Sequence, residues 1–127
     1  MTRSDKGQKH KHYHDDLQKL VVKSARRRRL PMFGTMNGML LAGGAAAGKK
    51  AVDLGMESGV PDLFMFKRGK GGKIGLAIEI KIGRDKLSPN QAHWFEVLRL
   101  CSIRCAVVKT LDDWERLIDD HLQVEVV

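Results

Sequence analysis

The chain has little of several features that mark particular classes of protein. Its 127 residues include two cysteines, three prolines and seven aromatic residues (two Trp, one Tyr and four Phe). No apolar run approaches the roughly 20 residues that a membrane-spanning helix needs. The N-terminal stretch MTRSDKGQKHKHYHDD is polar and lacks the apolar segment of a secretion signal. We therefore expect an intracellular, cytoplasmic protein with no membrane partner.

The two cysteines do not form a recognisable metal or redox motif. Cys101 and Cys105 have C-x-x-x-C spacing, whereas zinc and redox sites usually use C-x-x-C, and there is no second pair. A free cysteine commonly acts as a small core residue. The sequence therefore predicts two reduced cysteines that pack in the core.

Positive charge is in excess and is clustered. The chain has 23 Lys and Arg against 15 Asp and Glu, a formal net charge of +8. Clustered cations attract polyphosphate through Coulomb force and counterion release, which favours a nucleic-acid partner. A second interpretation, that the charge only keeps the protein soluble, stays open. The clusters lie at residues 26–29, 49–50 and 67–73.

The N-terminal residues are predicted to lie outside the folded core. Residues 1–11 read as a flexible basic arm, and residues 12–127 as a single domain. His10, His12 and His14 alternate in a way that is typical either of a metal-binding tract or of a solvated polar arm.

Hydrophobic periodicity and turn residues predict the remaining elements. Leu17, Leu20, Val21 and Ala25 recur at helical spacing. Alternating apolar segments bounded by glycine predict strands, and Ser88-Pro89 and Thr110 predict the starts of two helices. The expected helices are Asp15–Arg28, 45–54, 89–100 and 111–121, and the expected strands are 32–36, 62–67, 75–82 and 103–109, with a turn at Asn37-Gly38. This order predicts an α/β fold, a central mixed sheet flanked by helices.

Three charged residues on the two middle strands carry the main chemical signal. Asp62 is the first residue of one expected strand, and Glu79 and Lys81 project from the same face of the next. A hairpin through RGKGGK brings Asp62 beside Glu79. Two converging carboxylates repel each other unless a hard cation lies between them, and oxygen ligands suit Mg²⁺ or Mn²⁺. The alternative is a simple surface ion pair, since an isolated E-x-K motif is weak.

A bound divalent cation at this point would support phosphodiester chemistry. It lowers the pKa of a water molecule and neutralises charge on a phosphate. Lys81 would orient that water or stabilise the charge that develops on phosphorus.

The segment GVPDLFMF, followed by LAIEIKIGRDKLSPNQAHWF, resembles the VRR-NUC branch of the PD-(D/E)XK nucleases. More loosely, Asn37-Gly38 and the tail AVVKTLDDWERLI resemble other parts of that family, so the likeness extends over residues 13–122. The positions that carry the resemblance are Gly59, Pro61, Asp62, Leu63, Glu79, Lys81, Ser88, Pro89, Gln91 and Trp94.

The resemblance implies a PD-(D/E)XK restriction-endonuclease-like core and a set of site residues. It implies metal ligands at Asp62, Glu79 and the carbonyl of Ile80, and catalytic roles for Lys81 and Gln91. For Gln91 a solvated position on its helix is the alternative.

One position departs from the family pattern. The family usually has a glutamate on its first helix, whereas this chain has Asp15, which is one methylene shorter. Asp15 is therefore either a metal ligand, directly or through water, or a helix N-terminal charge. His93 is an alternative general base that we do not favour, and Trp94 is expected in the core.

Four cations are predicted to contact phosphates. Arg84 and Lys86 follow the E-x-K strand, and Lys49 and Lys50 form one of the basic clusters. For Arg84 and Lys86 the alternative is ordinary loop charge.

The combined signals predict a Mg²⁺- or Mn²⁺-dependent DNA endonuclease with no small-molecule cofactor. A short chain has little surface for reading bases, so we expect selectivity for DNA shape, on branched or four-way junction DNA. The resemblance implies a homodimer, and such minimal domains are frequent in phages. The first helix or the segment 43–51 would supply the dimer surface.

Two alternatives remain. One is a nuclease-fold protein that binds DNA with weak or no catalysis, and the other is an unrelated basic RNA-binding domain. The RNA-binding alternative is disfavoured because most of the aromatic residues are expected to face the core.

Overall fold

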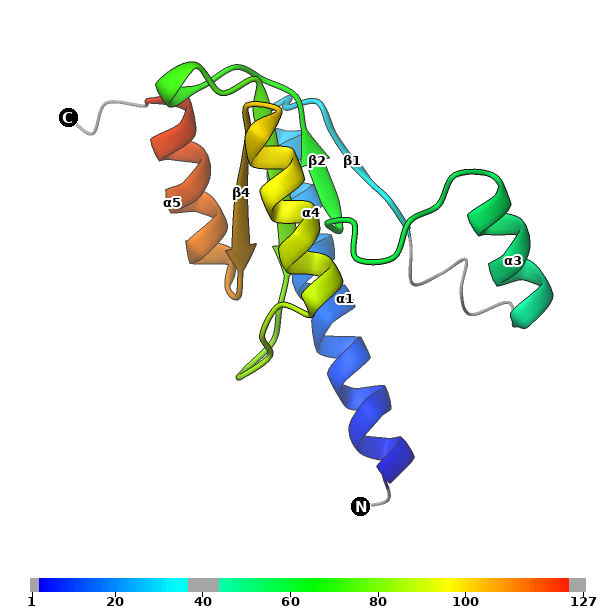
Figure 1. Ribbon diagram of the computed structural model, residues 1–127. Coiled ribbons are helices and arrows are strands. Elements are labelled where there is room, and N and C mark those ends of the chain that lie inside the picture. The colour runs from blue at the N-terminus through cyan, green and yellow to red at the C-terminus, as the bar shows by residue number, and fades with distance from the viewer. Residues whose placement is uncertain (1–2, 37–43, 124–127) are drawn as a thin grey trace.

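The computed structural model describes residues 3–36 and 44–123, with side chains from His12 onward. The expected turn at Asn37-Gly38 lies outside these residues. Along the chain (Figure 1) the elements are α1 (Arg3–Arg27), β1 (Met32–Gly34), α3 (Ala45–Asp53), β2 (Leu63–Met65), the 3-10 turn η1 (Lys70–Gly72), β3 (Gly75–Ile80), α4 (Pro89–Leu100), β4 (Ile103–Val108) and α5 (Leu111–Leu122).

The strands form one mixed sheet. Their order is β1-β2-β3-β4, in which β1, β2 and β3 pair antiparallel and β3 pairs parallel with β4. The parallel pair requires a crossover, and α4 provides it. The predicted α/β class and the central mixed sheet with flanking helices are confirmed.

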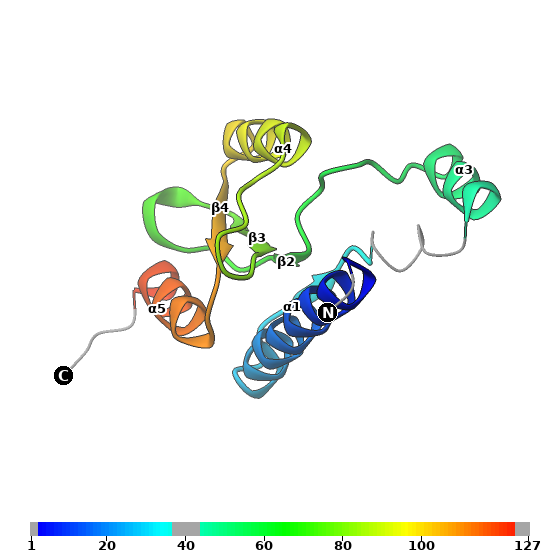
Figure 2. The same ribbon diagram turned by 90° about the horizontal axis from the view of Figure 1, so that it is seen from below.

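The helices cover the two faces of the sheet unequally. Figure 2 shows α1 and α5 on one side of the sheet and α4 on the other. The larger core lies beneath α1 and α5 and includes Val21, Ile78, Ile80 and Trp114, all fully buried. A smaller cluster beneath α4 contains Ala77, Leu98 and Ile103, with Phe64, Trp94 and Cys105 packed against it. β3 is therefore buried along its whole length, which explains its nearly continuous apolar sequence.

Local capping determines where α4 and α5 begin. The Ser88 hydroxyl accepts a hydrogen bond from the Gln91 backbone, and the Gln91 side chain accepts one from the Ser88 backbone, which completes a capping box with Pro89 at the first helical position. Thr110 caps α5 in the same way through Asp113. The sequence signals at Ser88-Pro89 and Thr110 therefore predicted both helix starts.

A network of polar side chains joins α1 to α5. The buried Ser24 hydroxyl accepts a hydrogen bond from Trp114 Nε1 (2.9 Å) and donates one to Glu115 Oε1 (2.6 Å). Arg28 forms ion pairs with Glu115 (2.5 Å) and Asp119 (2.9 Å). Together with the apolar contacts beneath them, these bonds fix the angle at which α1 crosses the sheet.

Helix α3 stands apart from the sheet, on the long connection between β1 and β2 (Figures 1 and 2). Val52 and Leu54, at its C-terminal end, are among the exposed large hydrophobic residues. Its bounds match the predicted helix closely, so its local sequence rather than packing on the sheet accounts for its formation.

Most aromatic residues face the core, as expected, and three are exposed. Phe95 and Trp114 are buried, and Phe64 and Trp94 pack against the smaller cluster, whereas Tyr13, Phe33 and Phe66 are exposed. Phe33 stacks on Phe64 and Phe66, with ring centroids 5.7 and 5.9 Å away. The stack therefore runs from the smaller core to exposed positions at the β1 edge of the sheet.

The start of the first helix was predicted incorrectly. We expected it to begin at Asp15, whereas α1 begins at Arg3. No proline separates the two positions, and the helix continues through Gly7 and through polar sequence that has no apolar periodicity. Whether residues 1–11 move as an arm, and whether residues 12–127 act as one domain, stay predictions. None of the described helices combines the length and apolar character that crossing a membrane requires.

Candidate active site

Asp62 and Glu79 lie side by side at one end of the β2–β3 pair. The register pairs Leu63 with Ile78, so the residue before Leu63 stands opposite the residue after Ile78. The carboxylate of Asp62 accepts a hydrogen bond from the Ile80 backbone N–H at 2.8 Å. This bond holds one carboxylate against the strand that carries the other.

Glu79 is buried, although glutamate side chains in proteins are usually charged and exposed. It is 4% exposed. Its Oε1 accepts a hydrogen bond from Gln91 Nε2 at 2.9 Å and lies 3.8 Å from Lys81 Nζ. Its Oε2 has no hydrogen-bond partner among the described residues. One oxygen of the carboxylate is thus held in place, and the other stays free to bind something else.

Burial and the neighbouring carboxylate raise the pKa of Glu79 to about 8. Loss of water is the larger cause, and the charge of Asp62 acts in the same direction; Lys81 and His14 oppose both. A carboxylate held this far from its ordinary pKa marks a candidate functional position. A cation bound between the two carboxylates would offset the repulsion between their negative charges.

His14 belongs to this group, although the sequence analysis did not place it there. Its Nε2 lies 3.3 Å from Asp62 Oδ2, and its Nδ1 lies 3.5 Å from Asp15 Oδ1. The hydrogen bond to Asp62 is the largest cause that raises the pKa of His14. The sequence singled it out only through the alternation of His10, His12 and His14, which indicated either a metal-binding tract or a solvated arm.

Asp15 lies beside the site rather than at its centre. It lines the same cleft as Asp62 and Glu79, and its carboxylate contacts His14. The helix therefore presents His14, and not Asp15, to Asp62. A role for Asp15 as a metal ligand, directly or through water, stays a prediction.

Gly59 allows the chain before Asp62 to approach α4 closely. Its φ is +87°, and a Cβ atom there would lie 2.6–2.8 Å from backbone and side-chain atoms of Asn90 and Gln91. A side chain at this position would be strained and would also push the start of α4 away. The glycine of the G-x-P-D motif thus keeps Gln91 within reach of Glu79.

Asp62 and Glu79 line a cleft of about 1190 Å³ between α1 and the sheet. One wall contains Asp62, Glu79, Lys81 and Gln91. The other wall is formed by α1, and its lining residues from His14 onward are His14, Asp15, Gln18, Lys19, Val22, Lys23, Arg26 and Arg27. The cleft is therefore acidic at the carboxylates and basic along the helix.

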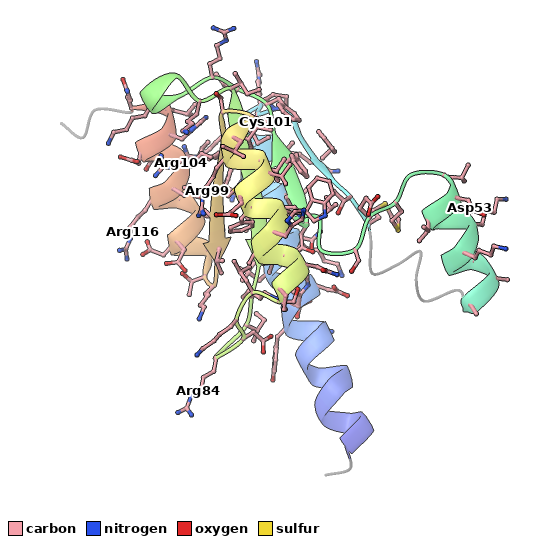
Figure 3. The ribbon with its side chains drawn as sticks, viewed as in Figure 1. Asp53, Arg84, Arg99, Cys101, Arg104 and Arg116 are labelled. Carbon is pink, nitrogen blue, oxygen red and sulfur yellow. The ribbon has the colours of Figure 1, made fainter. Side chains whose placement is uncertain are left out.

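The four cations predicted to contact phosphates lie elsewhere. Lys49, Lys50, Arg84 and Lys86 are all exposed, and none is among the described residues that line the cleft. Figure 3 shows Arg84 at the tip of the loop after β3, directed away from the body of the molecule. The structure does not bring these four residues together with the carboxylates, and their phosphate contacts stay predictions. His93 is exposed on α4, and Trp94 packs beside the smaller core as expected.

The site suits a hard divalent cation with few protein ligands. The described residues contain no cluster of three or more His, Cys, Asp or Glu side chains arranged to hold a metal. Magnesium, however, keeps several water ligands and is commonly held by one or two carboxylates. Asp62, the unpaired Glu79 Oε2 and the Ile80 carbonyl offer such a set of oxygens.

Comparisons with known proteins agree with the fold. The sequence model of the VRR-NUC domain family matches residues 41–111, more than half of the chain. A solved structure described as a VRR_NUC domain protein superposes with a TM-score of 0.69 at 23% identity, covering 88% of this chain and 89% of that one. At that identity the structural likeness shows the fold alone. No curated protein matches the sequence.

Proposed function

This chain belongs to the VRR-NUC family, a family of nuclease domains, and from that premise we propose that it is a divalent-metal-dependent DNA endonuclease. The observation that carries the proposal is the buried Glu79, whose Oε2 is unpaired beside the carboxylate of Asp62. A purely structural glutamate would be expected to have both oxygens satisfied. This one is held by Gln91 on a single oxygen and faces a cleft.

Asp62, Glu79 and the Ile80 carbonyl would hold the metal ion. When bound, Mg²⁺ or Mn²⁺ supplies an activated water and neutralises charge on the scissile phosphate. Asp62 is oriented for this by the Ile80 N–H, which donates a hydrogen bond to its Oδ2. Ile80 would thus serve the site twice: its backbone N–H orients Asp62, and its backbone carbonyl would bind the metal ion.

Lys81 and Gln91 act on the same side of the site. Lys81 is held 3.8 Å from Glu79 Oε1, at a distance where its ammonium group can reach a phosphate oxygen beside the carboxylates. Positive charge there stabilises the transition state more than the substrate, because negative charge grows on the phosphoryl oxygens. Gln91 is a positioning residue, since its side-chain amide orients Glu79 and its oxygen caps α4.

Plasmid nicking tests the proposal directly. The wild-type protein is expected to convert supercoiled plasmid to open circles with Mg²⁺ or Mn²⁺, and to lose this activity when EDTA is added. Asp62→Asn should be inactive, whereas Asp53→Asn, an exposed aspartate at the end of α3, should cut normally. Nicking that persists in EDTA, or in Asp62→Asn, would overturn the assignment.

We further propose that the active form is a homodimer that prefers branched DNA. Two apolar surfaces of the same chain support this: Val52 and Leu54 on α3, and the Phe33–Phe64–Phe66 stack at the sheet edge. Two copies related by a two-fold axis could cover both surfaces and present two sites to two DNA backbones.

Light scattering tests the dimer and a time course tests the preference. A dimer that cuts a four-way junction faster than a duplex of the same length supports both parts. A stable monomer that cuts duplex and junction equally well would remove this second proposal and leave the first in place.

A further inference from the structure

A row of cations on α1 lies next to the candidate active site. Lys19, Lys23 and Arg26 follow one another at i, i+4 and i+7, so they share one face of the helix. This face adjoins the face that carries Leu17, Val21 and Ala25 into the core. All three cations are exposed, and all three line the cleft that contains Asp62 and Glu79.

These cations lack the partners that neighbouring charges have. Arg28, on the core side of α1, is paired with Glu115 and Asp119. Lys19, Lys23 and Arg26 form no ion pair with any other residue that the structure describes with side chains. The described chain thus leaves three cations without an ion-pair partner along one wall of the cleft.

The spacing of the row fits a nucleic-acid backbone. Lys19 and Arg26 are separated by about 10 Å along the helix axis, at about 1.5 Å per residue. One DNA strand carries about three phosphates over such a length. A chain of phosphates that begins at the carboxylates could thus meet a cation at each turn of α1.

We propose that α1 binds the sugar-phosphate backbone of the cleaved DNA strand, and that Lys19, Lys23 and Arg26 guide this strand away from the metal-binding carboxylates toward the C-terminal end of the helix. The inference rests on the proposed nuclease function. It extends the nucleic-acid contact that the sequence predicted for the cluster at residues 26–29 along α1 to Lys19 and Lys23.

The salt dependence of binding distinguishes this row from general positive charge. Lys19→Ala/Lys23→Ala removes two cleft cations at exposed helical positions where alanine is well tolerated. Arg99→Ala/Arg116→Ala is the matched control, because it removes the same charge from exposed positions on α4 and α5 that do not line the cleft. Affinity for a labelled DNA junction is measured by fluorescence anisotropy in EDTA, between about 50 and 200 mM salt, where cleavage does not interfere.

The α1 variant is expected to lose about two units of the slope of log K against log salt, and to bind roughly tenfold more weakly. The control should keep a wild-type slope. An unchanged slope in the α1 variant, or an equal loss in both variants, would overturn the inference. If circular dichroism shows that the alanine pair is unfolded, Lys19→Gln/Lys23→Gln replaces it.

Cleavage in Mg²⁺ is recorded separately for the wild-type protein. Failure of the wild type to cut would contradict the proposed function, whereas the anisotropy slopes test the α1 row whether or not cleavage occurs. A failure of the proposed function and a failure of the α1 inference can therefore be told apart.

Discussion

Two groups of charged and polar side chains on this molecule differ in how completely they are satisfied. At the α1–α5 junction, Ser24, Arg28, Trp114 and Glu115 donate and accept hydrogen bonds among themselves. At the end of β2 and β3, two carboxylates lie together and one buried oxygen of Glu79 is unpaired. The two groups lie along the same helix, since α1 contributes Ser24 and Arg28 to the first and His14 to the second.

The difference separates stability from function. A buried polar network whose groups are paired helps to specify how two helices pack. An unpaired buried carboxylate costs free energy of folding and is retained where it is used for binding or catalysis. Changes at the junction should therefore lower stability with little effect on activity, and changes at the carboxylates should abolish activity without lowering stability.

The largest effect is expected from the carboxylates and their lysine. Asp62→Ala, Glu79→Ala and Lys81→Ala should each reduce cleavage by roughly 100- to 1,000-fold or more, because each removes a group that acts on the transition state. Their circular dichroism spectra should match that of the wild type. Cleavage at the wild-type rate in any of the three would contradict the site.

The next largest effect is on pH-dependent stability. The ordinary pKa of a glutamate is 4.5, and that of Glu79 in the folded protein is about 8. Between these values the folded state binds more protons than the unfolded state, so its free energy of unfolding falls as the pH rises from about 4.5 to 8 and levels off above.

Glu79→Gln should remove this decline, which is on the order of a few kcal/mol. Urea unfolding of the metal-free protein at several pH values measures it. Glu96→Gln, at an exposed position on α4, is the control and should unfold like the wild type at every pH. If the free energy of unfolding depends on pH in the same way for Glu79→Gln and for the wild type, Glu79 does not titrate in this range.

A smaller effect is expected at the junction. Ser24→Ala leaves the buried Trp114 N–H without its acceptor and should lower the free energy of unfolding by about 1–3 kcal/mol. Cleavage at a temperature where the variant is folded should stay near wild type. Loss of activity without loss of stability would contradict the separation of the two groups.

The smallest effect is expected from the partly exposed ion pairs of the same junction. Arg28→Ala should cost about 1 kcal/mol or less, because solvent screens both of its pairs. The cost should shrink further in high salt, which a thermal melt at two salt concentrations would detect. A cost as large as that of Ser24→Ala would mean that Arg28 also supports the packing of α1 through its aliphatic stem.

The sequence by itself determined most of the elements and the pairing of two site residues. Helix caps at Ser88 and Thr110, and the alternation in the strands, depend on atoms a few residues apart and could be predicted locally. Asp62 and Glu79 could be placed side by side for the same reason, because a short hairpin leaves little freedom in the register of its strands.

The rest was decided by the angle at which helices cross the sheet. His14 is 48 residues from Asp62 in sequence, and their contact depends on how α1 rotates about its axis when Val21 and Ala25 enter the core. The same rotation lines Lys19, Lys23 and Arg26 along the cleft. Local periodicity shows that a helix has an apolar face, but it does not specify what lies beside that face. Only tertiary packing placed a histidine at the carboxylates, a row of cations next to them, and a stack of three phenylalanines toward the β1 edge of the sheet.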